Sequence, residues 1–220
     1  MPLTRNELDL KLDEVRTMLI SMADQVCSMV LDGVEGAVSD DLPMLERVVE
    51  ADPMIDDLED RIMKEVFQLM VMQSPVSEDA RLLMGTLSIV GELEQAGDDA
   101  VKLARRASKM RGKFREDLLA PLGALAESSV QMMSDAMALY THYDDAKAME
   151  IIEGDEMIDS AYKRARRHIL EVADSEGPLS RDMFRTIEIF HALEHFADHG
   201  VEIAKRLRKF RRPVSAMADG

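Results

Sequence analysis

The chain has 220 residues and a formal net charge of −16, with 46% hydrophobic, 32% charged and only 4% aromatic residues and no tryptophan. Because strands favour β-branched and aromatic residues, this composition predicts an all-α fold and argues against a β-sheet protein. The negative charge excludes broad binding to the phosphate backbone of nucleic acids.

Cysteine content and apolar runs restrict the protein further. Cys27 is the single cysteine, which excludes an internal disulfide bond and a cysteine-based metal site. The opening residues, MPLTRNELDLKLDEVR, carry charges where a secretory signal has an apolar segment. No apolar run approaches the roughly 20 residues that a membrane-spanning helix needs. We therefore expect a cytoplasmic protein without a transmembrane segment.

Apolar residues recur with helical spacing along six long segments, separated by Pro, Gly and Asp. The predicted helices cover about 4–36, 41–73, 77–111, 116–142, 144–175 and 181–211. Asp40 or Asp41 is expected to cap the second helix, Pro75 to end it, and Gly112 to cap the end of the third. Each helix carries one apolar stripe, so each must pack against neighbours.

The two halves of the chain repeat one another at three places, in the same order. The matched pairs are VVEADPMIDD with IIEGDEMIDS, PVSED with PLSRD, and ELEQAGDDAVKLARR with ALEHFADHGVEIAKR. Chance would not keep order and spacing together, so the pattern indicates an internal duplication. We predict two tandem three-helix bundles, residues 1–112 and 113–212, followed by a frayed tail at 213–220.

Each repeat keeps pairs of acids four residues apart, on one face of a helix. Like charges at this spacing repel one another by about 0.2–0.5 kcal/mol, and a bound cation removes the repulsion. The acids persist in both halves while their neighbours differ, which favours a cation site over a merely solvated face. The eight candidate ligands are Asp52, Asp56, Glu94, Asp98, Asp155, Asp159, Glu194 and Asp198.

The ligand types bear on the choice of metal. Carboxylate oxygens are hard donors that favour Mg²⁺, Mn²⁺, Ca²⁺ or iron. In the last helix, His191, His195 and His199 share an arc with Glu194 and Asp198, opposite the apolar residues. These histidines are either nitrogen ligands that favour iron, zinc or nickel, or polar residues on an exposed face.

The repeated blocks VVEADPMID, QSPVSEDARLL and ELEQAGDDAVKLA, with their counterparts IIEGDEMID, EGPLSRDMF and ALEHFADHGVEIA, resemble the PhoU family of phosphate-uptake regulators over about residues 5–211. The resemblance implies two tandem three-helix bundles with a repeated E(D)-x-x-x-D signature, which falls on the eight acids. Some members bind clusters of metal ions there. The family usually has a basic residue after the glutamate, where this chain has Gln95 and His195.

The resemblance also implies a regulator that is not an enzyme. Such a protein docks to the ATPase subunit of the phosphate ABC transporter and to the phosphate-sensing histidine kinase, at the inner face of the cell membrane. We expect a homodimer that binds iron, zinc, manganese or magnesium ions and no nucleic acid. Basic residues at the ends of the third and sixth helices, such as Arg106 and Arg206, either complement the helix dipoles or contact an acidic partner or anionic lipid.

Two other protein classes fit parts of the sequence. A ferritin-like di-iron carboxylate oxidoreductase needs two E-x-x-H pairs that project into one bundle, and this chain has one, Glu188/His191. A histidine-phosphotransfer bundle needs an exposed reactive histidine, for which His168 is the candidate. Neither class explains the repeated acids.

Overall fold

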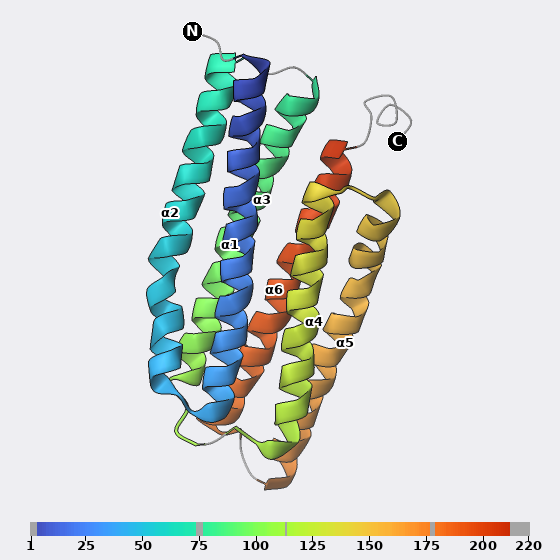
Figure 1. Cartoon of the computed structure of the whole chain (residues 1–220). Coiled ribbons are helices and arrows are strands. Elements are labelled where there is room, and N and C mark those ends of the chain that lie inside the picture. Colours follow the sequence, from blue (N-terminus) through green and yellow to red (C-terminus); the bar gives the residue numbers. More distant parts are fainter. Residues whose placement is uncertain (1–3, 74–76, 113, 177–178, 212–220) are drawn as a thin grey trace.

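Six long α-helices make up the fold (Figure 1). The computed structural model describes residues 4–73, 77–112, 114–176 and 179–211, and these contain no strand. The helices are α1 (Arg5–Ser39), α2 (Leu42–Gln73), α3 (Ser77–Ala107), α4 (Glu116–Thr141), α5 (Asp145–Glu176) and α6 (Arg181–Arg211). The predicted all-α fold with six helices is confirmed.

The turn between α1 and α2 follows its local sequence. α1 continues beyond the predicted end at residue 36 and stops at Asp40, whose φ of 57° places it in the left-handed region. An aspartate tolerates this conformation better than most residues. The Oδ1 atom of Asp41 then accepts a hydrogen bond from the backbone N–H of Met44 at 3.0 Å, so Asp41 caps α2 as predicted.

The end of α3 differs from the prediction. The helix ends at Ala107, before the predicted end at residue 111, so Gly112 is not its cap. The helix closes with tighter turns, in which Lys109 bonds Arg106 and Met110 bonds Ala107, and the backbone N–H of Arg111 then donates a hydrogen bond to Asp182 of α6 at 3.1 Å. The predictions for Pro75 and for the tail at 213–220 lie outside the described residues.

Each half packs its three helices against one another. α1, α2 and α3 make mutual contacts, and so do α4, α5 and α6. Within α6, the side chains of Ile189, Leu193 and Phe196 are fully buried, at the spacing of one helix face. The boundary at residues 112/113 stays a prediction.

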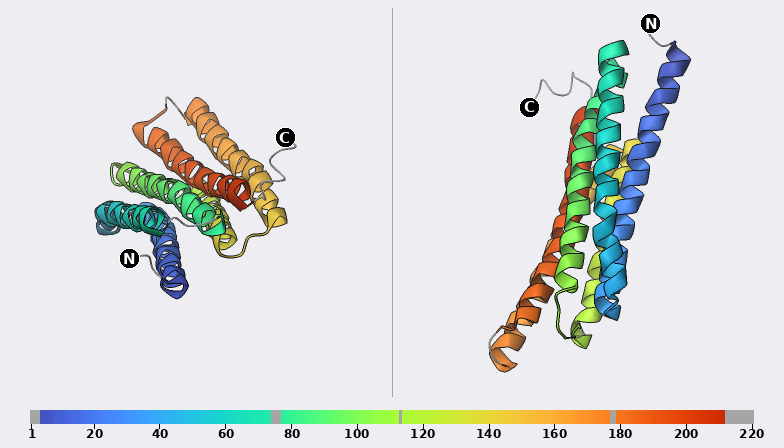
Figure 2. Two further views of the ribbon diagram at one scale, coloured as in Figure 1. Left: turned by 90° about the horizontal axis from the view of Figure 1, so that it is seen from above. Right: turned by 90° about the vertical axis from the view of Figure 1, so that its left-hand side faces the viewer.

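The two halves share one core. α3 and α6 run antiparallel and make the most extensive contact of any helix pair, while α1 and α4 form a second contact between the halves. Both views in Figure 2 show α3 beside α6. The buried apolar residues form one continuous cluster that reaches from Leu8 in α1 to Leu207 in α6. None of the described helices has an apolar stretch long enough to cross a bilayer.

Candidate metal-binding site

In the first half, four predicted acids come from two neighbouring helices, Asp52 and Asp56 from α2 and Glu94 and Asp98 from α3. Partial burial raises the pKa of Asp52, and the charges of Asp56 and Asp98 raise it further. Partial burial also raises the pKa of Glu94, together with the charges of Asp98 and of three acids on α2, Glu59 among them. These four acids with Glu59 form the first acid surface.

Glu59 was missing from the predicted ligands. Partial burial raises its pKa, and the nearby charge of Asp56 adds to the effect. The residue lies three positions after Asp56, on the same face of α2, which is the signal that sequence analysis could have used. At the corresponding position of the second half stands Tyr162, so a comparison of the repeats did not reveal Glu59.

In the second half, Asp155 and Asp159 of α5 face Glu194 and Asp198 of α6, and these four residues form the second acid surface. Burial raises the pKa of Glu194 to about 7, and the charge of Asp198 and a hydrogen bond with Asp159 add to it. The Glu194 side chain is only 16% exposed. Lys163 lies 2.6 Å from Asp159 and lowers the pKa of that carboxyl group.

Both acid surfaces have the chemistry of a hard-cation site. Each gathers carboxylates from two helices, and carboxylate oxygens are the donors that Mg²⁺, Mn²⁺ and ferric iron prefer. Without a cation the carboxylates raise one another's pKa, which shows that their negative charges are incompletely compensated.

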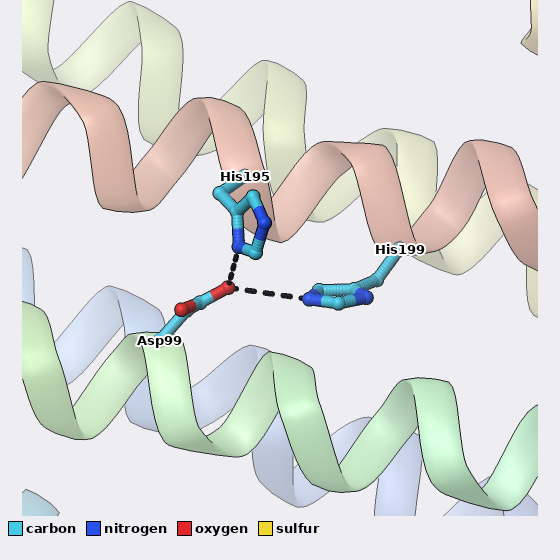
Figure 3. Close-up of side chains that lie close together, drawn as sticks. All are labelled: Asp99, His195 and His199. Atoms are coloured by element: carbon cyan, nitrogen blue, oxygen red, sulfur yellow. Dashed lines mark hydrogen bonds and ion pairs between the residues drawn. The ribbon is translucent and has the colours of Figure 1, made fainter.

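Histidines of α6 meet an acid of α3 between the halves (Figure 3). The Oδ2 atom of Asp99 lies 2.6 Å from Nδ1 of His195 and 3.2 Å from Nε2 of His199. Asp99 is 3% exposed and His199 is 5% exposed, so the interpretation of His199 as a residue on an exposed face is wrong. The physical reason is that α6 packs against α3 along this side of the helix. His191 remains exposed.

Buried charges extend this contact. The Oε2 atom of Glu92 lies 2.8 Å from Nδ1 of His199, and the guanidinium group of Arg206 pairs with the other oxygen of Glu92. Glu92 is 7% exposed. Sequence analysis missed both buried acids, Glu92 and Asp99. One signal was present, because Asp99 and His199 occupy the same position in the ungapped alignment of the two repeats.

The charges of this network are matched. Burial lowers the pKa of His199, but hydrogen bonds with Asp99 and Glu92 outweigh burial and raise the pKa to about 9. Burial raises the pKa of Asp99, but hydrogen bonds from His199, Lys102 and His195 bring it down to about 2. A protonated His199 therefore lies between two carboxylates at neutral pH in the metal-free protein.

Two basic residues near the ends of α3 and α6 form ion pairs with acids of the same chain. Arg106 pairs with Glu188 at 2.9 Å, and Arg206 pairs with Glu92 and donates a hydrogen bond to Ser88 at 2.6 Å. These contacts cross between the halves. Arg106 and Arg206 thus hold α3 and α6 together, a role that neither sequence interpretation included.

The structure also shows the surroundings of the residues that pointed to a di-iron oxidoreductase or to a histidine-phosphotransfer bundle. The carboxylate of Glu188 is engaged with Arg106, and His191 lies 3.8 Å from Glu194 on the exposed side. This E-x-x-H pair does not project together into the interior of a bundle. The Nε2 atom of His168 lies 2.9 Å from the carboxylate of Asp117.

Comparisons with known proteins agree along the chain. A family model described as "PhoU domain" matches twice, at residues 19–107 and 122–207. The phosphate-specific transport system accessory protein PhoU homolog of Clostridium acetobutylicum is 26% identical over 204 residues, which cover 92% of this chain and 93% of that protein. The accessory protein PhoU of Escherichia coli is 25% identical over 164 residues, 74% of this chain and 68% of its own length.

Two solved structures share the fold. The crystal structure of PhoU from Pseudomonas aeruginosa has a TM-score of 0.84 at 24% identity, covering 92% of this chain and 97% of that one. The phosphate transport system regulatory protein PhoU from Streptococcus pneumoniae has a TM-score of 0.85 at 22% identity, covering 92% and 96%. The family model matches most of the chain, once in each half, and the chain therefore belongs to the PhoU family, with two PhoU domains in tandem.

Proposed function

We propose that this protein regulates phosphate uptake and the response to phosphate starvation, and that it acts by docking and not by catalysis. Its relatives are named accessory proteins of the phosphate-specific transport system. In this proposal, the protein is a cytoplasmic homodimer. It contacts the ATPase subunit of the phosphate ABC transporter and the phosphate-sensing histidine kinase.

The first and second acid surfaces are the proposed cation sites of this regulator, for iron, zinc, manganese or magnesium. The observation that carries this part is that α5 and α6 bring four carboxylates together in the second acid surface, where burial, Asp198 and Asp159 raise the pKa of Glu194 to about 7. A cation bound among these oxygens would remove the mutual repulsion and keep every carboxylate ionised. Binding would also change the charge of the surface that a partner meets.

The test replaces the acids that α3 and α6 contribute to the two acid surfaces by neutral amides. The acid-surface variant carries Glu94→Gln, Asp98→Asn, Glu194→Gln and Asp198→Asn. We expect it to lose the metal bound at the acid surfaces, because neutral amides are much weaker ligands for a hard cation. In a host that lacks its own copy, we expect the variant to leave phosphate-starvation genes active in high phosphate.

A matched control removes the same number of negative charges at positions outside the acid surfaces. It carries Asp32→Asn, Glu35→Gln, Glu127→Gln and Asp135→Asn, at exposed positions of α1 and α4. Metal content is measured by elemental analysis of protein purified without chelators or affinity-tag metal. A folded acid-surface variant that contains less metal than the wild type and still represses normally would show that the cations of the acid surfaces are not needed for signalling. A metal content equal to that of the wild type would show that these acids are not ligands.

A further inference from the structure

Three side chains between the halves have the arrangement of a metal site that is separate from both acid surfaces. One donor atom from each of Asp99, His195 and His199 lies within 4.8 Å of the others. Asp99 comes from α3 and the two histidines come from successive turns of α6, and each imidazole ring turns one nitrogen toward the same oxygen of Asp99 (Figure 3). We propose that these residues bind one Zn²⁺ ion, which links the first half of the protein to the second.

The donor set selects the class of metal. Two imidazole nitrogens and one carboxylate oxygen suit Zn²⁺ and its neighbours in the first row, whereas the acid surfaces offer only oxygen. With bonds of about 2.0–2.2 Å, tetrahedral Zn²⁺ holds its donor atoms about 3.4 Å apart. The distance between Asp99 and His199 is 3.2 Å, close to this value. His195 lies nearer, at 2.6 Å, but its side chain is 47% exposed and has room to move outward.

The remaining polar atoms of the two buried ligands are held by other residues. Nδ1 of His199 faces Oε2 of Glu92 at 2.8 Å and donates its N–H there. An ion bound at Nε2 would replace the proton that this nitrogen carries in the metal-free protein. Histidine ligands of metals usually have such a carboxylate partner. Lys102 binds Oδ1 of Asp99 at 2.9 Å, which leaves Oδ2 to face both imidazole rings. Each buried ligand thus has one atom fixed and one directed at the proposed ion.

His195 is half exposed, so an ion could reach the three ligands from solvent and bind a water molecule as its fourth ligand. An ion-pair network without a metal would need no such opening. None of the three ligands belongs to the eight acids of the E(D)-x-x-x-D signature, so the inference goes beyond the proposed function. The two can also fail separately.

The experiment uses full-length protein, freed of metal with a chelator, as wild type and as the acid-surface variant. Each is titrated with Zn²⁺, and with Co²⁺ as a spectroscopic probe. In the acid-surface variant we expect one Co²⁺ per chain with the visible absorption of a tetrahedral site. X-ray absorption of the zinc form should show scattering from imidazole rings.

Substitutions in the acid-surface variant then identify the ligands. His195→Ala, at a half-exposed position, is expected to lower zinc affinity about tenfold or more, and Glu92→Gln by about 10–100-fold. His191→Ala is the matched control: this exposed residue stacks on His195 with ring centroids 6.0 Å apart but offers no ligand. Circular dichroism verifies that each variant is folded.

The possible results separate clearly. Zinc bound through imidazole in the acid-surface variant, weakened by His195→Ala and not by His191→Ala, supports the site whether or not that variant still represses. Equal affinity in the two histidine variants, oxygen-only coordination, or no zinc binding in the acid-surface variant would overturn it. The cluster would then be an ion-pair network that contains no metal.

Discussion

α3 and α6 are equivalent helices of the two repeats, and some of their differences lie where they touch. On the acid surfaces both helices carry a glutamate and an aspartate four residues apart. At the contact between the halves, Asp99 of α3 corresponds to His199 of α6, and Gln95 corresponds to His195. In a symmetric contact between identical chains, an aspartate would meet its own copy. Duplication in one chain allows the second copy to become histidine, so that a repulsive pair becomes an attractive one.

The flanking ion pairs show how far the two sides of this contact still correspond. Arg106 and Arg206 are equivalent, and each reaches across to the opposite helix, to Glu188 and Ser88 respectively, which are themselves equivalent positions. Only one side has the additional buried acid Glu92, where the second half has alanine. The buried charges are therefore concentrated on one side of an otherwise symmetric interface.

The largest expected effect comes from replacing His199, which pairs with both Asp99 and Glu92. In the presence of a chelator, His199→Leu should lower the free energy of unfolding by about 3 kcal/mol, because Glu92 and Asp99 then remain buried without their shared cation. His191→Leu, on the exposed side of the same helix, should change it by less than about 0.5 kcal/mol. Urea unfolding measures both. Equal stability of the two variants would show that the pair does not hold the halves together.

The pairing of His199 with these two acids also predicts that the stability of the metal-free protein depends on pH. The pKa of His199 is raised from 6.5 to about 9, so its contribution to stability is complete below pH 6.5 and is lost as the pH rises through 9. At about 1.4 kcal/mol per pH unit, the contribution is at most about 3 kcal/mol. The pKa of Asp99, about 2, lies far below this range. The difference in unfolding free energy between wild type and His199→Leu should therefore narrow between pH 6 and pH 9.5, and a constant difference would contradict the assignment.

The second acid surface should also lose stability as the pH rises, but over a lower pH range. The pKa of Glu194 is raised from 4.5 to about 7, so its contribution to stability is present below pH 4.5 and is lost as the pH rises through 7. Glu194→Gln should stabilise the metal-free protein by about 1–2 kcal/mol at pH 8 and not at pH 4.5. Glu94→Gln, its equivalent in the first half, should stabilise less, since no carboxylate hydrogen bond contributes to its raised pKa. Thermal unfolding at both pH values tests this, and equal gains would mean that the two surfaces are electrostatically alike.

The fold was predictable because its signals are local or repeated. Apolar spacing defines six helices, and the matched blocks show that the second three repeat the first. The end of α3 was not predicted correctly, and one contact of the segment that follows it, the bond from Arg111 to Asp182, joins residues far apart in the sequence. The acids of the E(D)-x-x-x-D signature were found because both halves retain them, whereas Glu59 was missed because its counterpart is Tyr162.

The charged network between the halves could not be predicted from the sequence, and the reason is physical. A helix in a single three-helix bundle has one buried side, and on this assumption His199 and Asp99 belong to the polar, exposed side. α3 and α6 instead have two buried sides, one facing their own bundle and one facing each other. Only the packing of the halves shows that polar residues of the second side are buried and must pair.

The smallest predicted effect compares the two equivalent arginines. Arg106 is 44% exposed and its partner Glu188 is 27% exposed, so Arg106→Met should lower the unfolding free energy by no more than about 0.5 kcal/mol. The partner of Arg206, Glu92, has a side chain only 9% exposed, and Arg206→Met leaves one of its oxygens buried without a guanidinium group. We expect a loss of about 1–2 kcal/mol there, since methionine keeps the apolar stem of the arginine but not its donors. Urea unfolding of the two variants, each in the presence of chelator, measures the difference. Equal losses would mean that the buried acid does not distinguish the two sides of the interface, and that His199 alone compensates the charge of Glu92.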